Sequence, residues 1–132
     1  MKKYEILRGR KPVSMLFSKA RSVRSGNIKV LFAPLELEQS SKRSLPKVLF
    51  IVGKRIVPDA VDRNRIKRLM REAYRREKSV AVACAGKYTG NENGTLGIAF
   101  MYIGRTKTIP SQECFRVEVR GLLQSILRAS PG

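Results

Sequence analysis

The chain has 132 residues, with 28 Lys and Arg against 10 Asp and Glu, which gives a formal net charge of +18. This length predicts a single domain over residues 1–132, and such a charge favours a polyanionic partner: RNA, DNA or an anionic membrane. The longest apolar runs, Val48 to Val52 and Ile98 to Ile103, are too short to span a bilayer, and the N-terminus lacks the apolar core of a signal peptide. We therefore expect a cytoplasmic protein without a membrane partner. Cys84 and Cys114 form no CxxC pair, so both are expected to be reduced and not to form a disulfide.

The first element in chain order is a short helix, which Pro12 opens and which runs from about Val13 to Ala20. This helix projects Phe17. On the residues alone, the pattern favours Phe17 as a core side chain over Phe17 as a binding residue.

A polar connector at residues 21–26, with room for one short strand, precedes a strand from Asn27 to Leu37. Alternation predicts Ile28, Val30 and Phe32 on one face, with Lys29 and Leu31 on the other. Glu36 and Glu38 share a face, as an acid-base or metal site requires, but the chain has no His to complete such a site. We interpret this pair as exposed carboxylates.

A second strand, from Lys47 to Gly53, is apolar almost throughout, which predicts burial on both faces in the middle of a sheet. It ends in two adjacent cations, Lys54 and Arg55. Asp59 is a good N-cap for a following helix, and Asp62, three residues later, resembles the second half of a capping box. Pro58 disfavours helix before that point.

The helix after Asp59 has two distinct faces. One stripe is apolar and repeats at helical spacing: Ile66, Leu69, Met70, Ala73 and Tyr74. The opposite surface is basic and includes Asn64, Lys67, Arg68, Arg71 and Arg75. Arg63 and Arg65 add two cations near the helix N-terminus, where the helix dipole favours phosphates.

Acidic residues balance few of these charges. Only Glu72 and Glu77 offer partners to the eight Lys and Arg between Arg63 and Lys78, so most of the cations repel one another. A solvated surface is the ordinary explanation of a charged helix face, but a polyanion explains a face of one sign better.

Beyond this helix, Ser79 to Ala85 extends the helical pattern, and residues Gly86 to Gly97 are predicted as a loop that inserts between helix and strand. A strand follows from Ile98 to Ile103. Pro110 and Ser111 start a last helix whose apolar stripe packs on the core: Phe115, Val119, Leu122, Leu123, Ile126 and Leu127.

This element order predicts an α+β sandwich with helices packed on one mixed, four-stranded sheet, in the order α-β-β-β-α-β-α. With no His, no phosphate-binding glycine loop and no metal-ligand spacing, the chain predicts no catalytic residue and no metal site in the protein itself.

The segment Ala60 to Arg75 (AVDRNRIKRLMREAYR) resembles the signature helix of the protein subunit of bacterial ribonuclease P, whose hallmark is Arg-Asn-Arg followed by a basic amphipathic helix. Val48 to Arg55 (VLFIVGKR) is similar to the family's strand that ends in two basic residues. Weaker similarities are found at Leu16-Phe17, at Val30 to Phe32 and at Ile98 to Arg105.

The resemblance implies an accessory subunit that assists endonucleolytic removal of the 5′ leader of precursor tRNA. In that family a large RNA carries out the hydrolysis with Mg²⁺, which the RNA mainly holds, and the protein binds the RNA and the leader. The implied partners are the ribonuclease P RNA and precursor tRNA, with no obligatory protein partner and no organic cofactor. The family also implies a left-handed β-α-β crossover between the two apolar strands, against the general right-handed rule.

Carried over residue by residue, the resemblance implies two sites. The RNA-binding residues are Lys54, Arg55, Arg63, Asn64, Arg65, Lys67, Arg68, Arg71 and Arg75, and the leader-binding cleft contains Phe17 and Phe32. The chain departs from the family in two places. Val13 stands where a second cleft aromatic is common, and one extra residue lies between Arg55 and Asp59.

Two other functions are compatible with the residues. A ribosomal or general RNA-binding protein needs only the same phosphate-binding face, and composition does not separate it from a ribonuclease P subunit. A protein-only nuclease fits poorly, because His is missing and carboxylates are scarce.

Overall fold

The computed structural model describes residues 6–36, 46–88, 94–104 and 108–129. These residues form eight elements in chain order: α1 (Arg10–Lys19), β1 (Arg21–Arg24), β2 (Ile28–Glu36), β3 (Lys47–Val52), α2 (Ala60–Arg76), α3 (Lys78–Tyr88), β4 (Gly94–Tyr102) and α4 (Gln112–Arg128). The strands make a four-stranded sheet in the order β1-β2-β4-β3. The predicted α+β architecture is therefore confirmed.

The sheet is mixed. β1 pairs with β2 and β2 with β4, both antiparallel, whereas β3 pairs with β4 in parallel. The chain passes from β3 to β4 through α2 and α3. This is the connection for which the family implies a left-handed crossover. The hand of that crossover stays a prediction.

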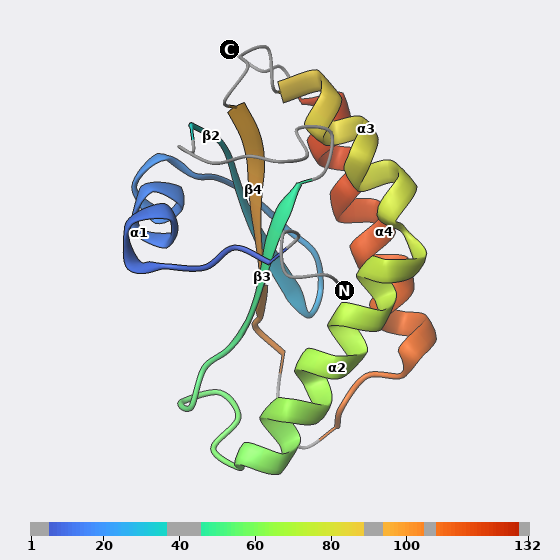
Figure 1. Cartoon of the computed structure of the whole chain (residues 1–132). Helices are drawn as coiled ribbons and strands as arrows, with labels where there is room; N and C mark the ends of the chain where they lie inside the picture. Colours follow the sequence, from blue (N-terminus) through green and yellow to red (C-terminus); the bar gives the residue numbers. More distant parts are fainter. Residues whose placement is uncertain (1–5, 37–45, 89–93, 105–107, 130–132) are drawn as a thin grey trace.

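Helices cover the two faces of the sheet unequally. α2, α3 and α4 lie together on one face and α1 lies alone on the other (Figure 1). The larger core, beneath the three helices, includes Ile28, Val30 and Phe32 of β2, as alternation predicts. The smaller core, beneath α1, consists of Leu7, Leu16, Ala33, Leu35 and Ala99.

The central strand is β4 rather than β3. Residues 95–100 are all buried, whereas β3 lies at the edge of the sheet and Leu49, Phe50 and Ile51 keep part of their surface exposed. The prediction of a central β3 is therefore wrong. An apolar strand can be covered by helices on its faces and still pair with only one other strand, so its sequence does not show whether it lies in the middle of the sheet or at the edge.

The predicted loop from Gly86 to Gly97 is also wrong at both ends. α3 continues to Tyr88 and β4 already begins at Gly94. Gly97 is a strand residue for a packing reason: a Cβ there would lie 2.7 Å from Cδ1 of Leu35, beneath α1. The remainder of the predicted loop, residues 89–93, lies outside the described residues, as does Glu38 of the Glu36–Glu38 pair.

Local signals place the two long helices. The side chain of Asp59 accepts a hydrogen bond from the backbone N–H of Val61 at 2.8 Å, and that of Ser111 accepts one from Cys114 at 3.2 Å. Both are N-caps of the predicted kind. The predicted stripe of α4 is confirmed, since five of its six residues are buried: Phe115, Val119, Leu122, Leu123 and Ile126.

Both cysteines are free, as predicted. Cys84 is buried and donates its S–H to the carbonyl oxygen of Leu123 at 3.2 Å, and burial raises the pKa of this thiol to about 11. Cys84 is therefore an uncharged core residue at neutral pH.

Candidate nucleic-acid interface

The basic side of α2 is exposed as the sequence predicts. Ile66, Met70, Ala73 and Tyr74 are buried against the sheet and α4. On the outer side, Asn64, Arg65, Arg68, Arg71 and Arg75 are exposed, and Lys67 is half-buried. The basic side chains of this helix therefore point away from the core together.

This outer side has two flanks, because β3 and α4 lie on opposite sides of α2. Arg71 lies on the β3 flank, where its guanidinium group is 5.9 Å from the ring centroid of Phe50, a cation–π contact. Phe50 in turn stacks on Phe100 at 5.6 Å between centroids. The aromatic edge of the sheet therefore holds Arg71 in place while its charge stays exposed.

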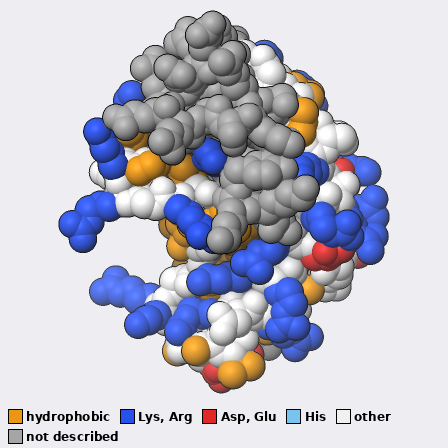
Figure 2. Space-filling view, viewed as in Figure 1, with side chains coloured by type: hydrophobic (Ala, Val, Ile, Leu, Met, Phe, Trp, Pro, Cys, Tyr) orange, Lys and Arg blue, Asp and Glu red, His pale blue; other side chains and the backbone are white. Residues whose placement is uncertain are grey.

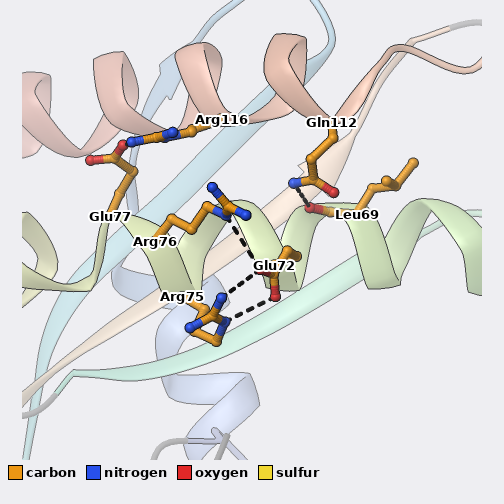
Figure 3. Close-up of polar contacts among 7 residues, drawn as sticks. All are labelled: Leu69, Glu72, Arg75, Arg76, Glu77, Gln112 and Arg116. Carbon is orange, nitrogen blue, oxygen red and sulfur yellow. Dashed lines mark hydrogen bonds and ion pairs between the residues drawn. The ribbon is translucent and has the colours of Figure 1, made fainter.

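The outer surface of α2 also carries an acidic residue, Glu72, among its cations. Glu72 pairs with Arg75 at 2.6 Å and with Arg76 at 3.4 Å (Figure 3). The hydrogen bond from Arg75, with smaller contributions from Arg76, lowers the pKa of Glu72 to about 2. Arg75 is thus a partly neutralised cation.

Arg63 is turned back toward the start of the helix. Its Nη1 donates to the carbonyl oxygens of Val57 at 3.0 Å and Pro58 at 2.7 Å. The side chain therefore ties down the segment that leads into α2, and its predicted contact with RNA stays a prediction. Sequence reasoning missed this structural task because the accepting carbonyls belong to the backbone.

Lys54 and Arg55 are exposed in a turn directly after β3. The backbone N–H of Val57 donates to the carbonyl of Gly53 at 3.0 Å, which closes the turn. Only residues 57–59 separate this turn from α2, so the basic pair lies near the N-terminus of that helix.

Glu77 was not recognised from the sequence as more than a helix partner. It caps the C-terminus of α2, with its backbone N–H bonded to the carbonyls of Ala73 and Tyr74, and its side chain is only 5% exposed. Its carboxylate accepts hydrogen bonds from Nε of Arg116 at 3.1 Å and Nε of Arg120 at 3.2 Å, both on α4. Burial alone would raise the pKa of Glu77, but the two arginines outweigh burial and hold it below the ordinary value.

The face of the sheet on the α1 side is only partly covered. Leu31, Leu49, Ile51 and Met101 on this face are half-buried, and Phe17 on α1 is 44% exposed. Figure 2 shows a hollow on this side, between α1 and the turn that follows β3, with hydrophobic side chains at its back and basic side chains on both rims. We call this surface the α1-side groove.

Phe32 does not line this groove. It is 1% exposed and belongs to the core beneath α2 and α4, and the guanidinium group of Arg21 lies 5.5 Å from its ring centroid. The assignment of Phe32 to a cleft with Phe17 is therefore wrong. A shift of one residue along a strand changes the face, and the neighbour that faces α1 is Leu31.

Two features are absent from the described residues, 6–36, 46–88, 94–104 and 108–129. Within those residues no group of three or more Cys, Asp or Glu side chains is placed to hold a metal ion, and the sequence contains no His. No helix in the described ranges is long and apolar enough to cross a membrane.

The fold and the site define a class: a basic α+β protein that presents an exposed cationic helix to a polyanion. Residues 1–86 match the family model described as Ribonuclease P. The chain is 42% identical over 123 residues to the ribonuclease P protein component of Chlorobaculum tepidum, covering 93% of this chain and 80% of that protein. It is 38% identical over 127 residues to that of Chlorobium phaeobacteroides, covering 96% and 87%. The chain therefore belongs to the ribonuclease P protein family.

Solved structures of the family share the fold. The ribonuclease P protein from Thermotoga maritima superposes with a TM-score of 0.56 at 23% identity, covering 94% of this chain and 96% of that chain. The protein from Staphylococcus aureus gives a TM-score of 0.53 at 17% identity, covering 94% and 93%. The arrangement of helices and sheet is thus retained at low sequence identity.

Proposed function

We propose that this chain is the protein subunit of a ribonuclease P ribonucleoprotein, in which it binds the catalytic RNA and the 5′ leader of precursor tRNA during tRNA maturation. The observation that carries the proposal is the outer side of α2, where the Arg-Asn-Arg signature begins a row of exposed cations. Membership of the family supports the same function.

The two surfaces suit two kinds of RNA contact. Cations spaced along α2, together with Lys54 and Arg55, match phosphates of a folded RNA, which presents charge rather than accessible base edges. The α1-side groove suits a single strand, because its back is apolar and its rims are basic. Phe17 is the exposed aromatic available there for stacking.

Chemistry is assigned to the RNA subunit. Site-specific hydrolysis of a phosphodiester needs an activated water, and the protein offers neither His nor, among its described residues, a group of metal ligands. In this proposal Mg²⁺ is bound mainly by the RNA, and the protein contributes binding and orientation. A cytoplasmic site of action follows from the proposed partners.

Reconstitution tests the proposal. The protein is added to a ribonuclease P RNA at moderate salt and low Mg²⁺, and cleavage of precursor tRNA is followed at the leader junction. We expect faster cleavage with both components, and none with protein alone at any Mg²⁺ concentration. Protein that leaves the RNA's activity unchanged would favour a ribosomal or general RNA-binding protein instead. Specific cleavage by protein alone would contradict the assignment of chemistry to RNA.

A further inference from the structure

Two arginines on α4 are fixed by one buried carboxylate. Each oxygen of Glu77 accepts one hydrogen bond, Oε1 from Arg116 and Oε2 from Arg120, and in both cases the donor is Nε. The two arginines are four residues apart on α4, so they lie on one side of that helix and repel each other unless an anion lies between them. Glu77 supplies that anion and fixes both side chains.

The hydrogen bonds leave most of each guanidinium group available. Within the described part of the chain, the Nη nitrogens of Arg116 and Arg120 make no hydrogen bond, and the side chains are 35% and 54% exposed. An arginine bound through Nε presents its Nη groups outward in a fixed plane, which suits an anion with several oxygens.

A third arginine lies beside this pair. α2 and α4 run side by side in the same direction, since Gln112 donates to the carbonyl of Leu69 at 3.3 Å and Arg116 meets Glu77 further along both helices. Arg76 is two helical turns beyond Leu69, on the same stripe of α2. Figure 3 shows its side chain on the side of α2 that faces α4. Arg76 is half-exposed, and its Nε contacts Glu72 at 3.4 Å.

Stability alone is a weak explanation of this arrangement. Taking a carboxylate and parts of two guanidinium groups out of water costs free energy that offsets their attraction, and apolar residues often replace such groups without loss. What the carboxylate provides beyond binding is orientation: it holds two cations of a strongly basic protein in one geometry at the protein surface.

We propose that Arg76, Arg116 and Arg120 form a second phosphate-binding site, on the α4 flank of α2, which takes backbone phosphates of a folded RNA. The site lies on the side of α2 away from β3. It therefore widens the interface from the outer side of α2 onto the neighbouring helix α4. The inference rests on the proposed RNA-binding function and adds α4 to the interface. The phosphates belong either to the RNA subunit or to the tRNA, and the experiment separates the two.

The test removes the two arginines of the site that Glu77 fixes, without leaving a buried charge. The triple variant Glu77→Leu/Arg116→Met/Arg120→Met replaces the three polar groups by apolar ones and lowers the net charge by one. Arg128→Gln is the matched control, because it removes one exposed charge from the same helix, two turns beyond Arg120. Affinity for the ribonuclease P RNA is measured over a range of salt concentrations, and affinity of the holoenzyme for mature tRNA is measured beside it.

If the phosphates belong to the RNA subunit, the triple variant binds that RNA about tenfold more weakly at moderate salt, and the slope of log affinity against log salt falls by about 1.5. If they belong to tRNA, the same loss appears only in holoenzyme binding of mature tRNA. The Arg128→Gln control changes neither slope. A triple variant indistinguishable from this control in both assays overturns the inference. Wild-type protein without salt-dependent binding to either RNA would instead contradict the proposed function itself.

A second variant covers the case in which the triple variant does not fold. Arg116→Lys/Arg120→Lys keeps the net charge and a cation beside each Glu77 oxygen but removes the planar fork. We expect binding to fall at least about threefold, while Arg128→Lys leaves it unchanged. Wild-type affinity in the double lysine variant would also overturn the inference.

Discussion

The two faces of the β-sheet carry different tasks. On one face, three helices bury side chains from β2, β3 and β4, and this core also seats the apolar stripe of α2. On the other face a single helix, α1, covers little more than β2, and Leu49, Ile51 and Met101 keep exposed surface. Substitutions on the first face should therefore act mainly through stability, and those on the open part of the second face mainly through binding.

The largest expected effect separates two neighbours on β2. Phe32→Ala should lower the free energy of unfolding by about 3–5 kcal/mol, because it empties a fully enclosed site in the larger core. Leu31→Ala, one residue away on the opposite, half-covered face, should cost about 1–2 kcal/mol. Denaturant unfolding of both variants measures the difference. Equal losses would mean that the two faces are equally important for stability.

The covered part of the α1 face should be sensitive to added volume. Gly97→Ala places a Cβ 2.7 Å from Cδ1 of Leu35, which is itself 1% exposed, so α1 or Leu35 has to shift. We expect a loss of about 1–3 kcal/mol. Gly121→Ala in α4 is the control, since its Cβ meets nothing within 4 Å, and it should stabilise the helix by up to about 1 kcal/mol. A neutral Gly97→Ala would show that α1 packs loosely.

A smaller, pH-dependent effect is expected at the link between α2 and α4. Glu77→Gln should lower the free energy of unfolding by about 1–2 kcal/mol at pH 7. This is less than for a fully buried ion pair, because both arginines are partly exposed. The pKa of Glu77 is lower in the folded protein than in the unfolded chain, so its contribution is present above the unfolded value of about 4.3 and is lost as pH falls through the folded value.

Thermal unfolding of wild type and Glu77→Gln at several pH values between 7 and 2 tests this. The gap between their melting temperatures should be constant near neutrality and should close below about pH 4. A gap that persists unchanged to pH 2 would show that the carboxylate charge is not what joins the helices.

The smallest effect on stability is expected on the open face. Phe17 is 44% exposed, so Phe17→Ala should cost less than about 1 kcal/mol of folding free energy. If the ring stacks on a leader base, the holoenzyme should lose about 1–2 kcal/mol of affinity for precursor tRNA and none for mature tRNA, which has no leader. Equal losses for both tRNA forms, together with a large drop in melting temperature, would place Phe17 with the core residues.

The sequence was sufficient wherever a signal is local. The spacing of Ile66, Met70 and Tyr74 sets the buried side of α2, and Asp59 marks its start, because both depend on residues within a few turns. Alternation likewise placed Ile28, Val30 and Phe32 on one face of β2. It did not say which helices cover that face, so it could not test the cleft position that the resemblance gave to Phe32.

Long-range contacts account for the remaining differences. The partners of Glu77 lie on α4, 39 and 43 residues away, and no spacing rule connects them to it. The glycines at the start of β4 led to the prediction of a loop. Gly97 is instead a strand residue that leaves room for the side chain of Leu35 on β2, a contact that the local sequence does not show. The edge position of β3 could not be predicted from its own residues either, because it follows from the insertion of β4 between β2 and β3.

The insertion of β4 between β2 and β3 affects how the chain folds while it is being synthesised. Neither neighbour can complete its pairing until β4 emerges, and β3 pairs with no other named strand in the described part of the sheet. At roughly 5–20 residues per second, the apolar run of β3 waits several seconds for its partner, while the residues of α2 and α3 emerge. During that interval the sheet beneath α2 lacks its central strand, so the apolar stripe of α2 and the exposed strand edges of β2 and β3 have no complete core to pack into.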